Sequence, residues 1–340
     1  MVQLSEVPII QAPMAGGPST PALAAAVGSA GGYGFVAGGY LSPAELREMV
    51  RAVRASVGAR FGVNLFVPSD PGDALEVAAY ARTLQPEADR LGVALGVPVW
   101  DDDDFEAKVD LVEEEGVDLV SFTFGCPTAT MVDRLHRSDC RVAVTVTSGA
   151  EASLAESSGA DALVVQGTES GGHQGGFLDL DANHRPLLSL LAGIRETVGI
   201  PLIGAGGVMS GVDVAAVLGG GAVAVQMGTA FLCSPEAGTS PVYRRALLDA
   251  RYPETIVTRA YSGRFARGLA NEFGVAHSRH APRAYPEVHH LTRPLRAAAT
   301  RAGDASVPNL WAGAGWRQVT SESAAGLVRR VAAEARRTAG

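Results

Sequence analysis

Short apolar runs recur eight times along the chain, and stretches typical of helices separate most of them. The runs cover residues 7–11, 33–37, 61–66, 119–124, 142–147, 162–166, 201–204 and 222–227. Continuous apolar strands that alternate with helices indicate parallel strands buried on both faces of a sheet. Eight such units predict an α/β fold, a closed (β/α)8 TIM barrel with its helices in an outer ring.

Helix-start signals lie between these runs. Thr20 can cap a helix that Pro21 opens, and Ser42-Pro43 opens another. Further helices are predicted over residues 149–157 and 186–198.

Two regions depart from the repeat. Residues 70–116 are too long for one crossover, so two helices separated near 97–104 are predicted. After the eighth strand, residues 234–300 are rich in Arg, Pro, Tyr and His. We therefore predict a barrel over 1–233, a smaller, mainly helical cap over 234–309, and a C-terminal segment over 310–340 whose amphipathic helix, 321–337, returns to the barrel.

Composition excludes several classes of protein. The three cysteines, Cys126, Cys140 and Cys233, lack metal-type spacing, so neither a zinc site nor a disulfide framework is expected and a cytoplasmic location fits. The longest apolar run, 212–232, is broken by Asp213, by glycines and by Gln226, so no membrane span is expected.

Charge is distributed unevenly within the net −8. Residues 1–240 hold 12 basic and 29 acidic side chains and residues 241–340 hold 16 and 7, so the last part of the chain is basic. Scattered arginines without interleaved aromatics favour an anion-facing wall over a nucleic-acid partner. The sole lysine, Lys108, is expected on a charged helix face, which excludes Schiff-base chemistry, and 101–104 is expected to be a solvated helix start.

Barrel enzymes build their sites at the C-terminal ends of the strands. Bare backbone N–H groups at Gly204, Gly206, Gly207 and Gly228, after the seventh and eighth strands, suit a phosphate. For any one of these glycines, a tight βα turn is the alternative explanation.

His173 lies after the sixth strand, within the glycine-rich run 167–176. The glycines let a flat ring and a substrate approach closely, and an imidazole with an ordinary pKa takes a proton at neutral pH. The alternative is a histidine that hydrogen bonds satisfy in a loop or core. We predict His173 as the reactive centre and expect His136, His289 and His290 at the surface or in the cap.

Several motifs together resemble the nitronate monooxygenases of the bacterial class I type, formerly called 2-nitropropane dioxygenases. The motifs are residues 11–17 (QAPMAGG), 62–66 (GVNLF), 124–127 (FGCP), 167–175 (GTESGGHQG), 204–208 (GAGGV) and 226–229 (QMGT). The likeness covers most of the chain, and the stretch that contains His173 is its most specific part.

The resemblance implies a non-covalent FMN and no metal. The FMN phosphate would lie against Gly206, Gly207, Gly228 and Thr229, and the flavin ring would lie near His173. The full predicted cofactor-binding set is Pro13, Met14, Ala15, Asn64, Thr147, Gln166, Gly171, Gly172, Gly204, Gly206, Gly207, Gln226, Met227, Gly228 and Thr229.

The same resemblance implies an activity. A nitronate, or a nitroalkane deprotonated with help from His173, gives one electron to FMN, the semiquinone reacts with O2, and a carbonyl compound and nitrite are released. His173 would be a base or an anion-stabilising donor. The expected partner is a small anionic or nitro substrate, with no nucleic acid and no membrane, and a homodimer is left open.

Flavin-dependent enoyl-thioester reductases are the alternative, because they share the barrel and the histidine motif. They would use His173 as a proton donor, with NAD(P)H reducing the flavin. Residues 124–127 and the cap through 311–316 resemble the nitronate enzymes more. A flavin-binding sensor without turnover is disfavoured, because binding alone needs no strand-end histidine ringed by glycines.

Overall fold

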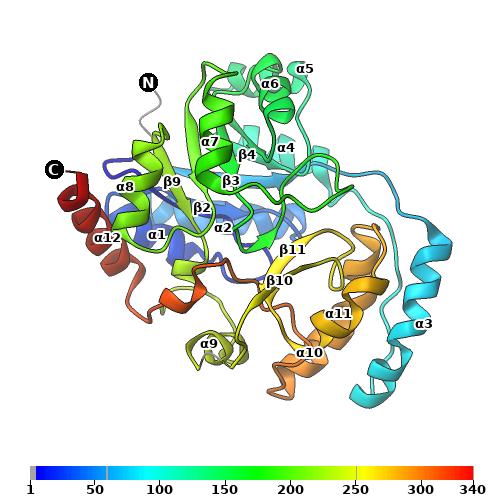
Figure 1. Ribbon diagram of the computed structural model, residues 1–340. Helices are drawn as coiled ribbons and strands as arrows, with labels where there is room; N and C mark the ends of the chain where they lie inside the picture. Colours follow the sequence, from blue (N-terminus) through cyan, green and yellow to red (C-terminus); the bar gives the residue numbers. More distant parts are fainter. Residues whose placement is uncertain (1–4, 59, 250, 340) are drawn as a thin grey trace.

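A parallel eight-stranded sheet curls into a barrel at the centre of the computed structural model, which describes residues 5–58, 60–249 and 251–339 (Figure 1). The strand order is β1-β9-β8-β6-β5-β4-β3-β2, and a parallel bridge from Ile10 to Tyr33 links the two edges. The strands are β1 Ile9–Gln11, β2 Gly34–Ala37, β3 Phe61–Phe66, β4 Leu119–Thr123, β5 Arg141–Val146, β6 Ala162–Gln166, β8 Leu202–Ala205 and β9 Ala224–Met227. The predicted barrel is confirmed, although residues 1–4 and 340 of the predicted ranges lie outside the described residues.

Eight helices form the outer ring. They are α1 Pro21–Ser29, α2 Pro43–Val57, α4 Phe105–Glu114, α5 Ala129–Arg137, α6 Gly149–Ser157, α7 Leu187–Arg195, α8 Gly211–Gly219 and α12 Ala324–Ala339. Helix α12 packs against α8 and α1, so the helix that belongs to the eighth strand arrives only after the cap. Among the described residues, no helix combines the length and the apolar character that a membrane crossing requires.

Local signals start these helices as predicted. Thr20 Oγ1 accepts the Leu23 N–H at 3.0 Å ahead of Pro21. Ser42 and Glu45 form a reciprocal capping box at the start of α2. These helix N-caps fix where the loops after β1 and β2 end.

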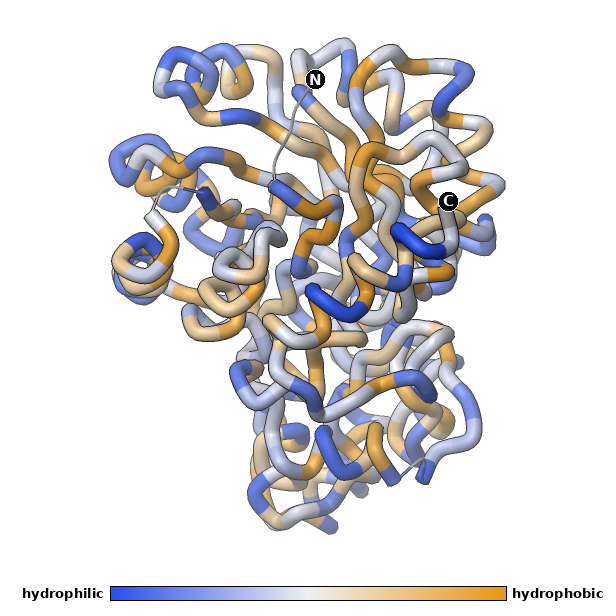
Figure 2. Tube along the Cα trace, turned by 90° about the vertical axis from the view of Figure 1, so that its left-hand side faces the viewer, coloured by the Kyte–Doolittle hydropathy of each residue, from blue (hydrophilic) through white to orange (hydrophobic). Residues whose placement is uncertain are grey.

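The smaller lobe is the cap, which lies below the barrel in Figures 1 and 2. Its regular elements are α9 Pro241–Leu248, β10 Thr255–Thr258, β11 Ala266–Leu269, α10 Glu272–His277 and α11 Glu287–Arg301. Short 3-10 turns at Thr229–Phe231, Ser278–His280 and Trp316–Gln318 complete the connections.

Helix α3 (Ala74–Leu91) belongs to this lobe rather than to the barrel ring. Residues 70–116 do hold two helices, as predicted, but the apolar face of α3 packs on the cap. Tyr80 and Leu84 share a buried cluster with Tyr261, Phe273 and Leu291, and Figure 1 shows α3 alongside α11. The cap predicted over 234–309 therefore shares its core with a helix from the predicted barrel range.

A small three-stranded sheet, separate from the barrel, joins the two lobes. The two-residue strand β7 (Gly172–His173) follows β6 and pairs antiparallel with β11, with His173 opposite Ala266. Because β11 also pairs with β10, a cap hairpin and a barrel loop form one small sheet. This sheet holds His173 at the boundary between barrel and cap.

Candidate active site

A cavity of about 380 Å³ lies at the carboxyl ends of the barrel strands, beneath the cap. Residues in or just after all eight barrel strands line it, and the cap adds Tyr243, Tyr261, Ser262, His289 and Arg296. Its size falls in the range of small-molecule sites, roughly 300–1,000 Å³.

Most of the predicted site residues meet in this cavity. Those that line it are His173, Pro13, Met14, Ala15, Asn64, Gln166, Gly171, Gly172, Gly206, Gly207, Gln226, Met227, Gly228 and Thr229. Thr147 and Gly204 are outside the lining.

Thr147 and Gly204 have other partners. The hydroxyl and the amide N–H of Thr147 both donate to the Glu151 carboxylate, at 2.9 and 2.6 Å, at the start of α6, while Thr145 lines the cavity. A Cβ on Gly204 would lie 2.3 Å from Cγ1 of Val217, so this glycine lets α8 pack closely on β8. For Gly204, the packing explanation fits the structure.

Glycines after β8 and β9 expose backbone at one end of the cavity. Gly206 and Gly207 have φ of +128° and +70°, in the left-handed region that glycine favours. A Cβ on Gly206 would lie 2.8 Å from Ser170 Oγ, so the loops after β6 and β8 touch there. Thr229 Oγ1 accepts the Gly313 N–H at 2.9 Å, beside the same loop after β6. Such a cradle of exposed N–H groups suits a phosphate.

Gln166 secures the histidine loop to the end of β6. Its Nε2 donates to the His173 carbonyl at 3.0 Å, and its Oε1 accepts the Gly175 N–H at 2.7 Å. Asn64 similarly crosses to β4, donating to Ser121 Oγ at 2.9 Å and to Thr123 Oγ1 at 3.0 Å. The polar floor of the cavity is therefore rigid before any ligand arrives.

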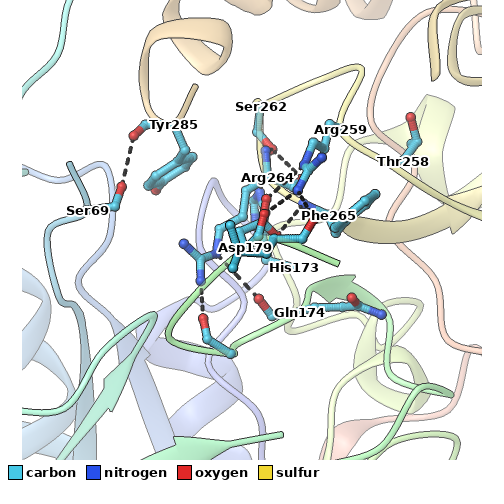
Figure 3. Close-up of polar contacts among 12 residues, drawn as sticks. Ser69, His173, Gln174, Asp179, Thr258, Arg259, Ser262, Arg264, Phe265 and Tyr285 are labelled. Atoms are coloured by element: carbon cyan, nitrogen blue, oxygen red, sulfur yellow. Dashed lines mark hydrogen bonds and ion pairs between the residues drawn. The ribbon is translucent and has the colours of Figure 1, made fainter. Parts of the chain in front are cut away.

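His173 lies in an aromatic enclosure. The rings of Phe124, Tyr285 and Trp311 surround it at centroid distances of 5.6, 5.8 and 5.4 Å. Its Nε2 is 2.7 Å from the hydroxyl oxygen of Ser262, a cap residue (Figure 3). Burial, reinforced by the charges of Arg264 and Arg296, lowers the pKa of His173 to about 3. The imidazole is therefore neutral at physiological pH.

Two arginines, the buried Arg264 and the half-buried Arg296, give this end of the site positive charge. Arg264 donates to the carbonyls of Gln174 and Gly176 and lies over the Phe124 ring, 4.1 Å from its centroid. Arg296 donates to Thr292 Oγ1 at 3.1 Å, to Asn309 Oδ1 at 3.0 Å and to the His289 carbonyl at 2.9 Å. Burial lowers the pKa of Arg296 to about 10. Because these partners are neutral, the positive charge favours an anionic ligand.

His289 is a site residue that the sequence did not reveal. It stacks on Tyr40 at a centroid distance of 4.1 Å and an interplanar angle of 7°, and it lines the cavity. Burial holds the pKa of His289 well below its ordinary value. The basic bias of the last hundred residues was the one sequence signal for this cap wall, which includes His289 and Arg296.

Two lining residues, Tyr40 and Phe124, have left-handed backbone, with φ of +67° and +78°. Such strain costs about 1–3 kcal/mol per residue and persists where neighbours enforce it. The Tyr40 N–H donates to Asp103 at 3.0 Å, and Asp103 pairs with Lys108 at 2.8 Å.

Lys108 is 1% exposed, so its predicted place on a charged helix face is wrong. The run 101–104 does precede α4 and is exposed as predicted, except at the half-buried Asp103. Hydropathy could not show that the amine of Lys108 would fold inward to meet Asp103. This pair instead supports the strained turn at Tyr40.

A second cavity of about 540 Å³ adjoins the first. The two share Gly16, Tyr40, Phe66, His289 and Arg296, so the Tyr40–His289 stack lies at their junction. Exposed carboxylates of Asp101 and Asp102 line the outer part.

Comparisons with known proteins agree with this geometry. The model of the nitronate monooxygenase family matches residues 1–334. A probable nitronate monooxygenase of Staphylococcus aureus (strain MSSA476) is 36% identical over 335 residues, covering 96% of this chain and 93% of the relative.

Solved structures are similar over nearly the whole chain. Nitroalkane oxidase from Streptomyces ansochromogenes has a TM-score of 0.96 and 45% identity, covering 98% of this chain and 97% of its own. FabK from Thermotoga maritima is more distant, with a TM-score of 0.77 and 27% identity, covering 98% of this chain and 94% of its own.

Proposed function

Because the chain belongs to the nitronate monooxygenase family, we propose that it oxidises nitronates with O2 on a bound FMN and releases a carbonyl compound and nitrite. The chain is an oxidoreductase of the TIM-barrel type. One observation carries the proposal: a neutral His173 lies among three aromatic rings in the cavity, and Arg296, whose hydrogen-bond partners are neutral, lines the same cavity. That arrangement suits a small anion.

The residues present fit an FMN. The cradle of Gly206, Gly207, Gly228 and Thr229 has the bare N–H groups that a phosphate needs, and a Cβ on Gly206 or Gly207 would fall under 3.0 Å from the loop after β6. Met14, Asn64 and Gln166 line the space between this cradle and His173, where the flavin ring would lie. FMN, when bound, accepts electrons from the substrate and passes them to O2.

Binding and orientation of the substrate fall to the cap side of the cavity. Arg296 lines the cavity and attracts the nitronate by charge, and His173 supplies a hydrogen bond. Arg264 does not line the cavity, but it packs on the Phe124 ring and adds positive charge to this side. Phe124, Tyr285 and Trp311 exclude water around the imidazole, which strengthens these interactions.

The low pKa of His173 bears on the form of substrate that reacts. A general base works best with a pKa near the working pH, whereas an imidazole with a pKa of about 3 holds a proton poorly until an anion arrives beside it. We therefore infer that preformed nitronates react faster than neutral nitroalkanes, with His173 acting as an anion-stabilising donor.

The test is product analysis with the FMN-loaded protein. Ethyl nitronate and O2 should give acetaldehyde and nitrite in equal amounts, and denaturation should release FMN. The protein should oxidise ethyl nitronate faster than nitroethane supplied in its neutral form. Protein that takes up no flavin, or that consumes nitronate without releasing nitrite, would contradict the proposal.

A further inference from the structure

We propose that Ser262 is a positioning residue that fixes the tautomer of the neutral His173 ring, with the proton on Nδ1, so that an N–H donor faces the substrate. The role of that donor rests on the proposed function, whereas the tautomer itself does not. Ser262 comes from the cap and His173 from the loop after β6, so the cap completes the site.

The contacts of the Ser262 hydroxyl decide where its single proton points. Its oxygen is 2.7 Å from Nε2 of His173, 3.3 Å from the Arg264 carbonyl and 3.4 Å from the Arg264 amide nitrogen. The amide N–H can only donate to the hydroxyl oxygen, so the hydroxyl proton goes to the imidazole or to the carbonyl. The contact with the imidazole is the shortest of the three, and we infer that the hydroxyl proton lies on it rather than on the longer contact with the Arg264 carbonyl. A nitrogen that accepts carries no proton of its own.

The other ring nitrogen is open to the cavity. Nδ1 of His173 has no hydrogen-bond partner among the described residues, and it is not among the fully buried unpaired atoms of that part of the chain. It therefore has surface in the cavity that His173 lines. Because burial and, to a smaller extent, the neighbouring arginines keep the ring neutral, it carries one proton for two nitrogens. Holding Nε2 as acceptor sends that proton to Nδ1.

The loop that carries Ser262 is held against the histidine segment from several sides (Figure 3). Arg259 pairs with Asp179 at 2.9 Å, and the Phe265 N–H donates to the same carboxylate at 3.2 Å. The Phe265 carbonyl accepts the Gln174 N–H at 2.8 Å. Ser262 is 2% exposed, so water has little access to replace its hydroxyl. The pair is preorganised rather than formed by substrate.

Nitrogen NMR of ¹⁵N-histidine-labelled holoenzyme tests the assignment directly. Two-bond ¹⁵N–¹H correlations at neutral pH distinguish a ring protonated at Nδ1 from one protonated at Nε2, and the His173 signals are those missing from His173→Asn. We expect the Nδ1–H pattern in the wild type and in Ser262→Thr, which keeps a hydroxyl. Ser262→Ala should show Nε2–H or a mixture. Ser278→Ala is the matched control, because Ser278 bonds Thr258 elsewhere in the cap.

Kinetics give the second readout. Ser262→Ala should lower kcat/KM for ethyl nitronate about tenfold, the size of one lost hydrogen bond, with FMN content unchanged and Ser262→Thr largely restored. An Nε2–H ring in the wild type, or unchanged His173 signals in Ser262→Ala, overturns the inference. If Ser262→Ala fails to fold, the wild-type and Ser262→Thr spectra still decide. A wild-type Nδ1–H ring in a protein that does not oxidise nitronates would refute the proposed function while leaving the tautomer assignment intact.

Discussion

Nε2 of His173 lies 2.7 Å from Oγ of Ser262, across the boundary between the barrel and the cap. The pairing of β7 with β11 holds this contact from the backbone side. A residue of the cap thus contacts the imidazole that the sequence predicts to be reactive (Figure 3).

Replacing the imidazole should separate binding from chemistry. His173→Ala is expected to retain FMN, because the phosphate cradle lies elsewhere, and to lose roughly a hundredfold or more in kcat/KM for ethyl nitronate. Flavin absorbance per protein and nitrite release measure the two effects. Turnover that survives the substitution would remove His173 from the mechanism.

Arg296 should control affinity for the anion. Arg296→Gln removes a half-buried charge whose hydrogen-bond partners are neutral, so KM for a nitronate should rise about tenfold or more while FMN stays bound. Arg293→Gln is the matched control, since Arg293 is exposed on the same helix and lines only the second cavity. Equal KM values for the two variants would refute the assignment.

Stability should fall at acid pH because of the buried histidine. The unfolded chain takes up a proton on His173 near pH 6.5, whereas the folded protein without ligand resists protonation until the pKa of about 3. The unfolded state therefore binds more protons between these values, and stability declines as pH falls through this window, by up to about 1.4 kcal/mol per pH unit for this group.

Urea unfolding of the flavin-free protein at pH 7.5 and pH 5 measures this dependence, with His173→Asn expected to show a shallower decline. An equal decline in both proteins would place the acid sensitivity elsewhere. Above pH 5, kcat/KM should not change with pH because of His173, since this imidazole is already neutral in the free enzyme.

The only lysine should matter for folding and for the Tyr40 turn. Lys108→Met leaves Asp103 without its cationic partner while it still accepts the Tyr40 N–H, and we expect a loss of about 3 kcal/mol in unfolding free energy. Asp102→Ala, at an exposed neighbour, should change stability by less than about 0.5 kcal/mol. Similar denaturation midpoints for both variants would show that the pair does not support this turn.

The barrel could be predicted because buried parallel strands appear as continuous apolar runs, and because Thr20 and Ser42 cap helices by local chemistry alone. The place of α3 could not be predicted, because an apolar helix face does not specify whether the barrel or the cap covers it. Thr147 followed the strand-end rule, yet it lies one residue past β5, where Glu151 takes its hydroxyl.

The cap wall was hidden for a different reason. His289 meets Tyr40, and Ser262 meets His173, only through contacts between residues far apart in the chain. Neither pair has a spacing motif, and His289 lies in a basic, proline-containing stretch that is also typical of a surface.

Anaerobic mixing of the FMN-loaded enzyme with ethyl nitronate, NADH and NADPH, each in turn, tests the central claim most directly. The account predicts that the nitronate reduces the flavin by one electron at the rate of turnover and that both pyridine nucleotides leave the flavin oxidised on that timescale. Bleaching by NADH or NADPH at catalytic speed, with no one-electron reduction by the nitronate, would contradict it and identify the enoyl-thioester reductase instead.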